Sequence, residues 1–285
     1  MARGYSAERY ESLFSVPVDG VNGADNVIRA DEPGRYRCKT IKHGDQLDVE
    51  IFPVWNTRAE ERKAKAAVTR KAQQALNDKN SHKRLIRLIN ANFTKDDIEI
   101  HITYKDEYLP LEEQAYRDVA NYFRRIKRYR KKKGITCAFK YVASVEYADE
   151  EGVAKRGHHH VIMTGAGISR DEAEEIWGRG RANSRRAQPD DFGLAGLAVY
   201  FVKTGQRAKG KRRYVSSKNL TQPTVTVADT KVSRRKATRL AHDAEAYGKD
   251  LFEHLYKGYL LNDLEVKTSA YVAGAYIYVR MRRLR

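Results

Sequence analysis

The pattern of hydrophobic and polar residues predicts a chain that mixes helices and strands. Residues 98–104, IEIHITY, alternate between apolar and polar positions, which is typical of a half-buried strand. Residues 111–133 predict the clearest helix, which ends at Gly134. Its apolar residues recur at helical spacing: Leu111, Ala115, Val119, Tyr122 and Ile126. Acidic residues at its start and basic residues at its end suit the helix dipole.

Similar patterns predict the remaining elements. Alternating or apolar runs indicate a β-hairpin over 35–52, turning at His43-Gly44-Asp45, and strands over 135–147, 157–164, 179–188, 223–228, 261–267 and 270–282. Helical patterns indicate one or two basic helices over 57–90, a short helix from Ser169 to Trp177, a helix over 191–204 and a long helix over 232–256. Asn80-Ser81 is the expected break in the first of these, and Ser169 with Glu172 forms a capping box.

The order of these elements predicts the fold class and the domains. The central β-α-β-β-α-β-α series favours an α+β fold, a ferredoxin-like antiparallel β-sheet with helices on one face. We expect an irregular segment over 1–34, a hairpin with basic helices over 35–95 and the central domain over 96–228. The last segment, 229–285, either completes the central domain or extends it.

The charge balance adds the first information about function. The chain has 55 Lys and Arg against 37 Asp and Glu, a net charge of +18. Such an excess favours a polyanionic partner, and nucleic acid is the main expectation. A solvated basic surface or a binder of anionic membranes is the alternative, but no basic amphipathic helix stands out.

The sequence also predicts where the protein works. No stretch approaches the ~20 apolar residues of a membrane-spanning helix. The first residues, MARGYSAERYESLF, lack the apolar centre of a signal peptide. Cys38 and Cys137 lack the spacing of a metal motif, so a reduced cytoplasmic setting is the simpler expectation.

Three consecutive histidines lie in the predicted strand 157–164, ahead of the apolar run 161–163. Because side chains alternate along a strand, His158 and His160 face the same way, about 6–7 Å apart. His159 faces the opposite way. Two neutral imidazoles at that spacing can bind one divalent cation, and a purely structural histidine run is the alternative.

A third metal ligand should come from the neighbouring strand. Glu146 is the candidate, because it lies near the end of the strand 135–147, across a turn from His158. An antiparallel partner strand could place its carboxylate beside the histidines. A surface carboxylate close to Asp149 and Glu150 is the alternative interpretation.

The helix expected over 191–204 carries a tyrosine and a lysine on one face. Tyr200 and Lys203 are three residues apart, and Gly193 and Gly196 continue the same stripe. Glycine within a helix costs about 1 kcal/mol relative to alanine, so we expect a close approach there, by a nucleic-acid backbone or by a packed protein element. A separate apolar stripe is expected to face the core: Phe192, Ala195, Val199 and Val202.

These motifs together resemble the rolling-circle replication initiators of the HUH endonuclease superfamily, in the single-tyrosine subclass. The segment HHHVIM at 158–163 is similar to their strand motif, although His159 replaces an aliphatic residue. Tyr200-x-x-Lys203 is similar to their tyrosine motif, and 98–104 takes the place of their first motif, with His101 as a departure. The wording of 138–228 resembles replication proteins of bacterial phages, plasmids and mobile elements.

The resemblance implies a specific chemistry. His158, His160 and Glu146 would hold Mg²⁺ or Mn²⁺, Tyr200 would attack a DNA phosphate, and Lys203 would help it. Lys203 either favours the phenolate or stabilises the transition state. The products would be a 5′-phosphotyrosine and a free 3′-OH. The substrate would be single-stranded or extruded origin DNA, with a host helicase and polymerase as further partners.

Two basic segments are candidate DNA contacts, with a solvated surface as the alternative. The segment 205–213 follows the tyrosine helix directly and supplies the predicted DNA-binding residues: Arg207, Lys209, Lys211, Arg212 and Arg213. The segment 124–133 has eight basic residues in ten, and it could equally be a charged helix end.

Two other functions remain open on the sequence. A relaxase or single-strand transposase would use the same fold, and a conjugative relaxase usually carries a third histidine, but His159 faces the wrong way for that role. A basic DNA-binding regulator without enzymatic activity would explain the charge, but it would not explain the ordered histidine and tyrosine motifs.

Overall fold

The structure is a computed structural model that describes residues 11, 14, 35–55, 70–148, 154–201, 214–269 and 273–284. The chain divides into two compact units. The first contains residues 1–84 and 223–285, and the second contains residues 85–222. Within the described part, no helix is long and apolar enough to cross a membrane.

The first unit is built on a five-stranded antiparallel sheet in the order β8-β1-β2-β10-β9. The expected hairpin is confirmed as β1 (Arg35–His43) and β2 (Gln46–Val54), joined at Gly44, which has a φ of 64°. The chain then returns after the second unit to add three strands: β8 (Thr224–Ala228), β9 (Tyr259–Thr268) and β10 (Ala275–Arg283). The C-terminal segment therefore shares its sheet with the N-terminal hairpin.

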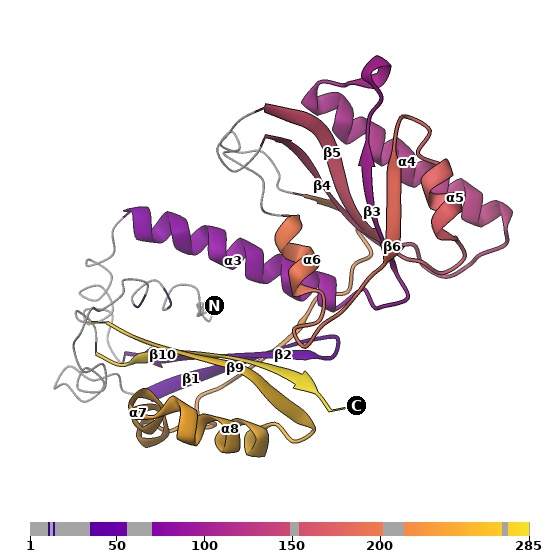
Figure 1. The fold of residues 1–285 in the computed structure, drawn as a ribbon. Helices are drawn as coiled ribbons and strands as arrows, with labels where there is room; N and C mark the ends of the chain where they lie inside the picture. Colours follow the sequence, from indigo (N-terminus) through magenta and orange to yellow (C-terminus); the bar gives the residue numbers. More distant parts are fainter. Residues whose placement is uncertain are drawn as a thin grey trace, which may run out of the picture. The chain divides into compact units, whose positions relative to one another are not determined.

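Two helices cover one face of this sheet, α7 (Arg234–His242) and α8 (Ala244–Leu255) (Figure 1). The single helix expected over 232–256 is wrong at one point, because Asp243 separates the two. Its backbone leaves the helical region, and its carboxylate accepts a hydrogen bond from the backbone N–H of Ala246 at 2.9 Å. Aspartate is a preferred residue at a helix N-terminus for this reason.

The helix α3 (Arg70–Asn90) contains residues of both units. The expected break at Asn80-Ser81 is wrong, because the helix continues through both residues. Leu76, Leu85 and Ile89 are buried on either side of this point, so packing outweighs the weak helix propensity of asparagine and serine. The rest of the predicted segment, 57–69, lies outside the described residues.

The second unit has the predicted ferredoxin-like arrangement. Its strands are β3 (Ile98–Thr103), β4 (Tyr141–Ala148), β5 (Ala154–Met163), β6 (Ala182–Arg186) and β7 (Val215–Ser216). They form an antiparallel sheet in the order β6-β3-β5-β4-β7. The helices α4 (Glu112–Lys132) and α5 (Arg170–Glu175) connect strands in the β-α-β-β-α-β pattern. The capping box of Ser169 and Glu172 is confirmed.

Helices cover both faces of this sheet, which corrects the expectation of one covered face. Ala143 and Val161 lie in the cluster formed with α4 and α5. Their strand neighbours Val142 and Ile162 lie in a second cluster, with the end of α3 and with α6 (Ala195–Tyr200). Because successive side chains on a strand point to opposite faces, the two clusters lie on opposite sides of the sheet.

Several predicted bounds also shift. The strand expected from 135 begins at Tyr141, because residues 135–140 first cross from the end of α4 to the sheet. The helix expected over 191–204 begins only at Ala195, and its residues 202–204 lie outside the described part. The α+β class itself is confirmed by the two antiparallel sheets and their helices.

Candidate metal centre

The hydrogen-bonded register of three strands brings the candidate ligands together. Glu146 on β4 lies directly opposite His158 on β5, as the hairpin geometry predicted. On the other side of β5, His101 of β3 lies opposite His160. The side chains of these four residues lie on the sheet face that α6 and the end of α3 partly cover.

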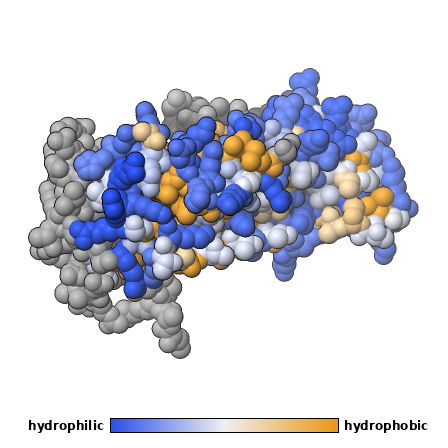
Figure 2. Space-filling model, turned by 90° about the horizontal axis from the view of Figure 1, so that it is seen from below, coloured by the Kyte–Doolittle hydropathy of each residue, from blue (hydrophilic) through white to orange (hydrophobic). Residues whose placement is uncertain are grey.

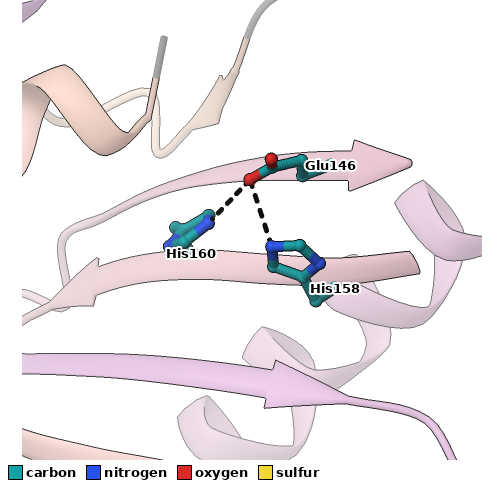
Figure 3. Close-up of side chains that lie close together, drawn as sticks. All are labelled: Glu146, His158 and His160. Carbon is teal, nitrogen blue, oxygen red and sulfur yellow. Dashed lines mark hydrogen bonds and ion pairs between the residues drawn. The ribbon is translucent and has the colours of Figure 1, made fainter. Parts of the chain in front are cut away.

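One carboxylate oxygen of Glu146 lies between the two imidazoles (Figure 3). The Oε2 atom is 3.1 Å from Nε2 of His158 and 3.1 Å from Nε2 of His160. The ligand atoms of all three residues lie within 4.8 Å of one another. Ligands on adjacent positions of a six-coordinate ion at ~2.1 Å lie ~3.0 Å apart, so the observed spacing fits a single divalent cation.

The protonation state of His160 also suits metal binding. Burial lowers the pKa of His160 to about 4, and the positive charge of a protonated His101 would lower it further. At neutral pH the imidazole is therefore uncharged, which is the form that donates a lone pair to a metal. The side chain of His158 is 25% exposed, against 7% for His160, so a bound ion would still be open on that side.

His159 has a structural role, as its position in the strand predicted. It is fully buried on the opposite face, where the Tyr104 hydroxyl lies 2.7 Å from its Nε2 atom. Its ring also contacts the ring of Trp177, with 5.8 Å between the centroids. Burial lowers the pKa of His159 to about 3, so the ring stays neutral in the folded protein.

The sequence alone assigned no role to His101, which lies beside the centre. The edge of its ring packs against His160, with 4.4 Å between the ring centroids. Its Nε2 atom is 3.1 Å from Glu99, a buried carboxylate that also accepts two hydrogen bonds from Arg185. Burial raises the pKa of Glu99, but the hydrogen bonds from His101 and Arg185 hold it below the usual value. The alternation of Glu99 and His101 showed that they share a face; only the strand order showed which face.

The helix α6 ends at this centre. Tyr200 is its last residue, and the placement of the tyrosine side chain lies outside what the structure describes. The next residue, Phe201, is fully buried, with its ring centroid 6.4 Å from that of His160. Lys203 and the predicted DNA-binding residues lie outside the described residues: Arg207, Lys209, Lys211, Arg212 and Arg213.

The glycines of the expected tyrosine stripe have different explanations. Gly193 precedes α6 and has a φ of 69°, and a Cβ there would lie 2.6 Å from the side-chain oxygen of Asn90. That oxygen accepts a hydrogen bond from the backbone N–H of Leu194 at 2.7 Å, which fixes the start of α6. Gly193 therefore serves the turn, whereas Gly196 is exposed and a Cβ there would meet nothing within 4 Å.

The expected core stripe of α6 is wrong. Val199 is 40% exposed, and the side chains that pack against the sheet are those of Leu194, Leu197, Ala198 and Phe201. The shift follows from the later start of the helix at Ala195, because residues before that point do not follow the helical period.

A cleft borders the same edge of the sheet. It has a volume of about 890 Å³ and runs along Thr103, Lys105 and Arg181. Thr103 is the strand partner of His158, so the cleft begins next to the candidate metal ligands.

Residues 97–205 match the sequence model of one family of replication-associated proteins, that of the replication-associated protein ORF2. The match covers less than half of the chain, and it includes the three candidate ligands, Tyr200 and Lys203. It supports a role as a replication initiator, with DNA as the partner. Neither the curated proteins nor the solved structures gave a match to the chain.

Proposed function

We propose that this protein is a rolling-circle replication initiator that nicks and rejoins one DNA strand in a metal-dependent reaction. The observation that carries the proposal is the convergence of Glu146, His158 and His160 at the end of the helix that contains Tyr200. The family match over 97–205 covers the same residues. The net charge of +18 suits a DNA substrate.

The proposed ligands are His158, His160 and Glu146, with Mg²⁺ or Mn²⁺ as the metal. A divalent cation at this position would offset the negative charge of the scissile phosphate and fix its orientation. Oxygen and nitrogen donors in one set are compatible with both ions, and Mn²⁺ accepts imidazole more readily than Mg²⁺ does. His101 and Phe201 support the His160 ring from two sides, which keeps the donor atom in place.

The proposed nucleophile is the phenolic oxygen of Tyr200. Free tyrosine has a pKa near 10, so its proton must leave as the oxygen attacks phosphorus. Lys203, three residues further on, is proposed to favour the phenolate or to stabilise the transition state. As the new O–P bond forms, the bond from phosphorus to the 3′ oxygen breaks, and that oxygen takes up a proton.

The products are a 5′-phosphotyrosine link and a free 3′-OH, which can prime DNA synthesis. Because the link preserves a phosphodiester, a 3′-OH can attack it later and rejoin the strand without ATP. Single-stranded or extruded DNA is the proposed substrate, since a backbone held in a duplex could not reach the tyrosine. The basic residues of 205–213 are the proposed contacts for that strand.

The test is covalent capture of DNA. The protein is incubated with a labelled single-stranded origin oligonucleotide and Mn²⁺, and adducts are separated by denaturing electrophoresis. We expect an adduct with the wild-type protein and none with Tyr200→Phe, because only the hydroxyl is lost. Tyr214→Phe removes a hydroxyl from a partly buried tyrosine of the same unit and should leave the adduct intact.

Metal dependence is tested in the same assay. EDTA, or the double substitution His158→Ala and His160→Ala, should abolish the adduct. An adduct in the Tyr200→Phe variant would refute the nucleophile, and full activity in EDTA would refute the metal centre. DNA binding without any adduct from the wild-type protein would instead favour a regulator that lacks enzymatic activity.

A further inference from the structure

The helix α7 of the first unit presents an exposed basic face that the nicking reaction does not use. Its sequence, RRKATRLAH, has four Lys or Arg residues and no acidic residue. Arg235, Arg239 and His242 are exposed and follow one helical stripe at steps of four and three. Figure 2, seen from the side on which α7 and α8 lie, shows strongly hydrophilic residues beside smaller apolar areas. The stripe therefore faces solvent in the described structure.

The opposite side of α7 is firmly packed. Ala237 and Leu240 are fully buried in the core of the first sheet, next to Phe252 of α8. The guanidinium of Arg239 lies over the ring of Tyr247, 4.1 Å from its centroid. A packed helix with a stacked arginine holds its charges in place, so less conformational freedom is lost when an anion binds.

The distribution of charge in α7 is not explained by helix stability. Its first turn has no acidic residue and contains Arg234, Arg235 and Lys236, although the positive end of the helix dipole lies there. The basic residues of α4 lie in its last turn instead, where positive charge stabilises a helix. The described residues also place no carboxylate within ion-pair distance of Arg235 or Arg239. A negatively charged partner accounts for charges that neither the helix nor a neighbouring acid requires.

We propose that α7 is a docking surface for duplex DNA, which it contacts mainly through the phosphate backbone. The exposed stripe has no Phe, Tyr or Trp, whereas proteins that bind single strands rely on aromatic side chains for stacking. A helix fits the major groove, and arginines about one helical turn apart can reach successive phosphates. This assignment rests on the proposed function, because an initiator must bind its origin as a duplex before one strand is opened.

The experiment measures binding of the full chain to a short, labelled, mixed-sequence duplex over a range of salt concentrations. In the double variant Arg235→Ala and Arg239→Ala we expect about a tenfold weaker Kd and a salt slope lower by about two, one per lost phosphate contact. Arg235→Lys with Arg239→Lys keeps both charges and should restore most of the affinity. Thermal melting checks that each variant is folded.

A matched control removes two exposed positive charges elsewhere in the same unit. Lys249 lies on α8 and Lys257 directly after it, and both are exposed. Lys249→Ala with Lys257→Ala should leave the Kd and the salt slope within about twofold and one half of the wild-type values. If this control weakens binding as much as the α7 variant, net charge explains the effect and the docking surface is wrong.

Two further measurements separate this proposal from the nicking reaction. The α7 variant should still form the Tyr200 adduct with a single-stranded oligonucleotide, and its affinity for that strand should be unchanged. Equal loss of single-strand and duplex affinity would overturn the assignment of a duplex. A wild-type protein that binds the duplex through α7 but forms no adduct would refute the nicking proposal alone.

Discussion

The two sheets of this protein use buried charge in different ways. In the first sheet, on the face away from α7 and α8, each carboxylate has its own partners: Asp48 lies 3.3 Å from His43 and accepts from Tyr278, and Glu50 lies 3.3 Å from Lys39. In the second sheet, one oxygen of Glu146 faces two histidines at the same distance. Among the described residues, only this second arrangement brings three ligand groups together.

The comparison shows what distinguishes a structural ion pair from a binding site. A buried carboxylate that is paired with one cation and one hydroxyl is satisfied, and it offers no convergent lone pairs. Two neutral imidazoles and a carboxylate have several lone pairs directed to one point, which a divalent cation can accept. A histidine facing a carboxylate on a strand is therefore not enough; the second histidine two residues away makes the site.

The largest expected effect concerns a buried carboxylate of the first unit. Glu11 is 1% exposed and bonds to Lys83 at 3.0 Å and to Lys79 at 3.1 Å. Glu11→Ala leaves the buried ammonium of Lys83 without this partner, so we expect a loss of about 3 kcal/mol in the free energy of unfolding. Chemical denaturation measures it. Glu146→Ala, in the less buried metal centre, should cost clearly less without metal; an equal loss would remove the distinction between the two sheets.

The next prediction compares one histidine from each sheet. His160→Ala removes one of three converging ligands and should weaken Mn²⁺ binding by about a hundredfold, or about 2.7 kcal/mol. His43→Ala removes a buried strand histidine that also faces a carboxylate, and it should leave Mn²⁺ affinity unchanged. Titration calorimetry with both variants measures the difference. Similar losses in the two variants would place the Mn²⁺ site elsewhere.

The smallest effect concerns His159, which is buried behind the metal ligands. The pKa of its ring is lowered by burial to about 3, below the ordinary value of about 6.5. The unfolded chain therefore binds a proton below pH 6.5 that the folded protein does not bind. The stability from the neutral ring is complete above pH 6.5 and falls by about 1.4 kcal/mol per pH unit towards pH 3.

Replacement of that ring should flatten the pH dependence. Between pH 7 and pH 5, His159→Gln should lose about 2 kcal/mol less stability than the wild-type protein. Denaturant titration at the two pH values, in EDTA so that metal binding does not contribute, measures the difference. Parallel pH profiles would show that His159 is not the buried neutral group that its contact with Tyr104 indicates.

The comparison of helices shows where prediction from pattern fails. The helix α4 was predicted within one residue at each end, because its apolar period is long and Gly134 ends it. The helix α6 was predicted four residues too early, because Gly193 adopts a positive φ and Asn90, a distant residue, fixes the start of the helix. Its buried face changed accordingly from Val199 to Leu197 and Phe201.

The sequence by itself determined the α+β class, the hairpin of Glu146 with His158, and the separation of His159 from its neighbours. Each of these follows from the period of a strand or helix, which is a local property of the backbone. Only the tertiary structure decided that His101 joins the metal centre, that the C-terminal strands pair with the N-terminal hairpin, and that α6 ends beside His160. Strand order and helix docking depend on contacts between distant residues, and no local period specifies them.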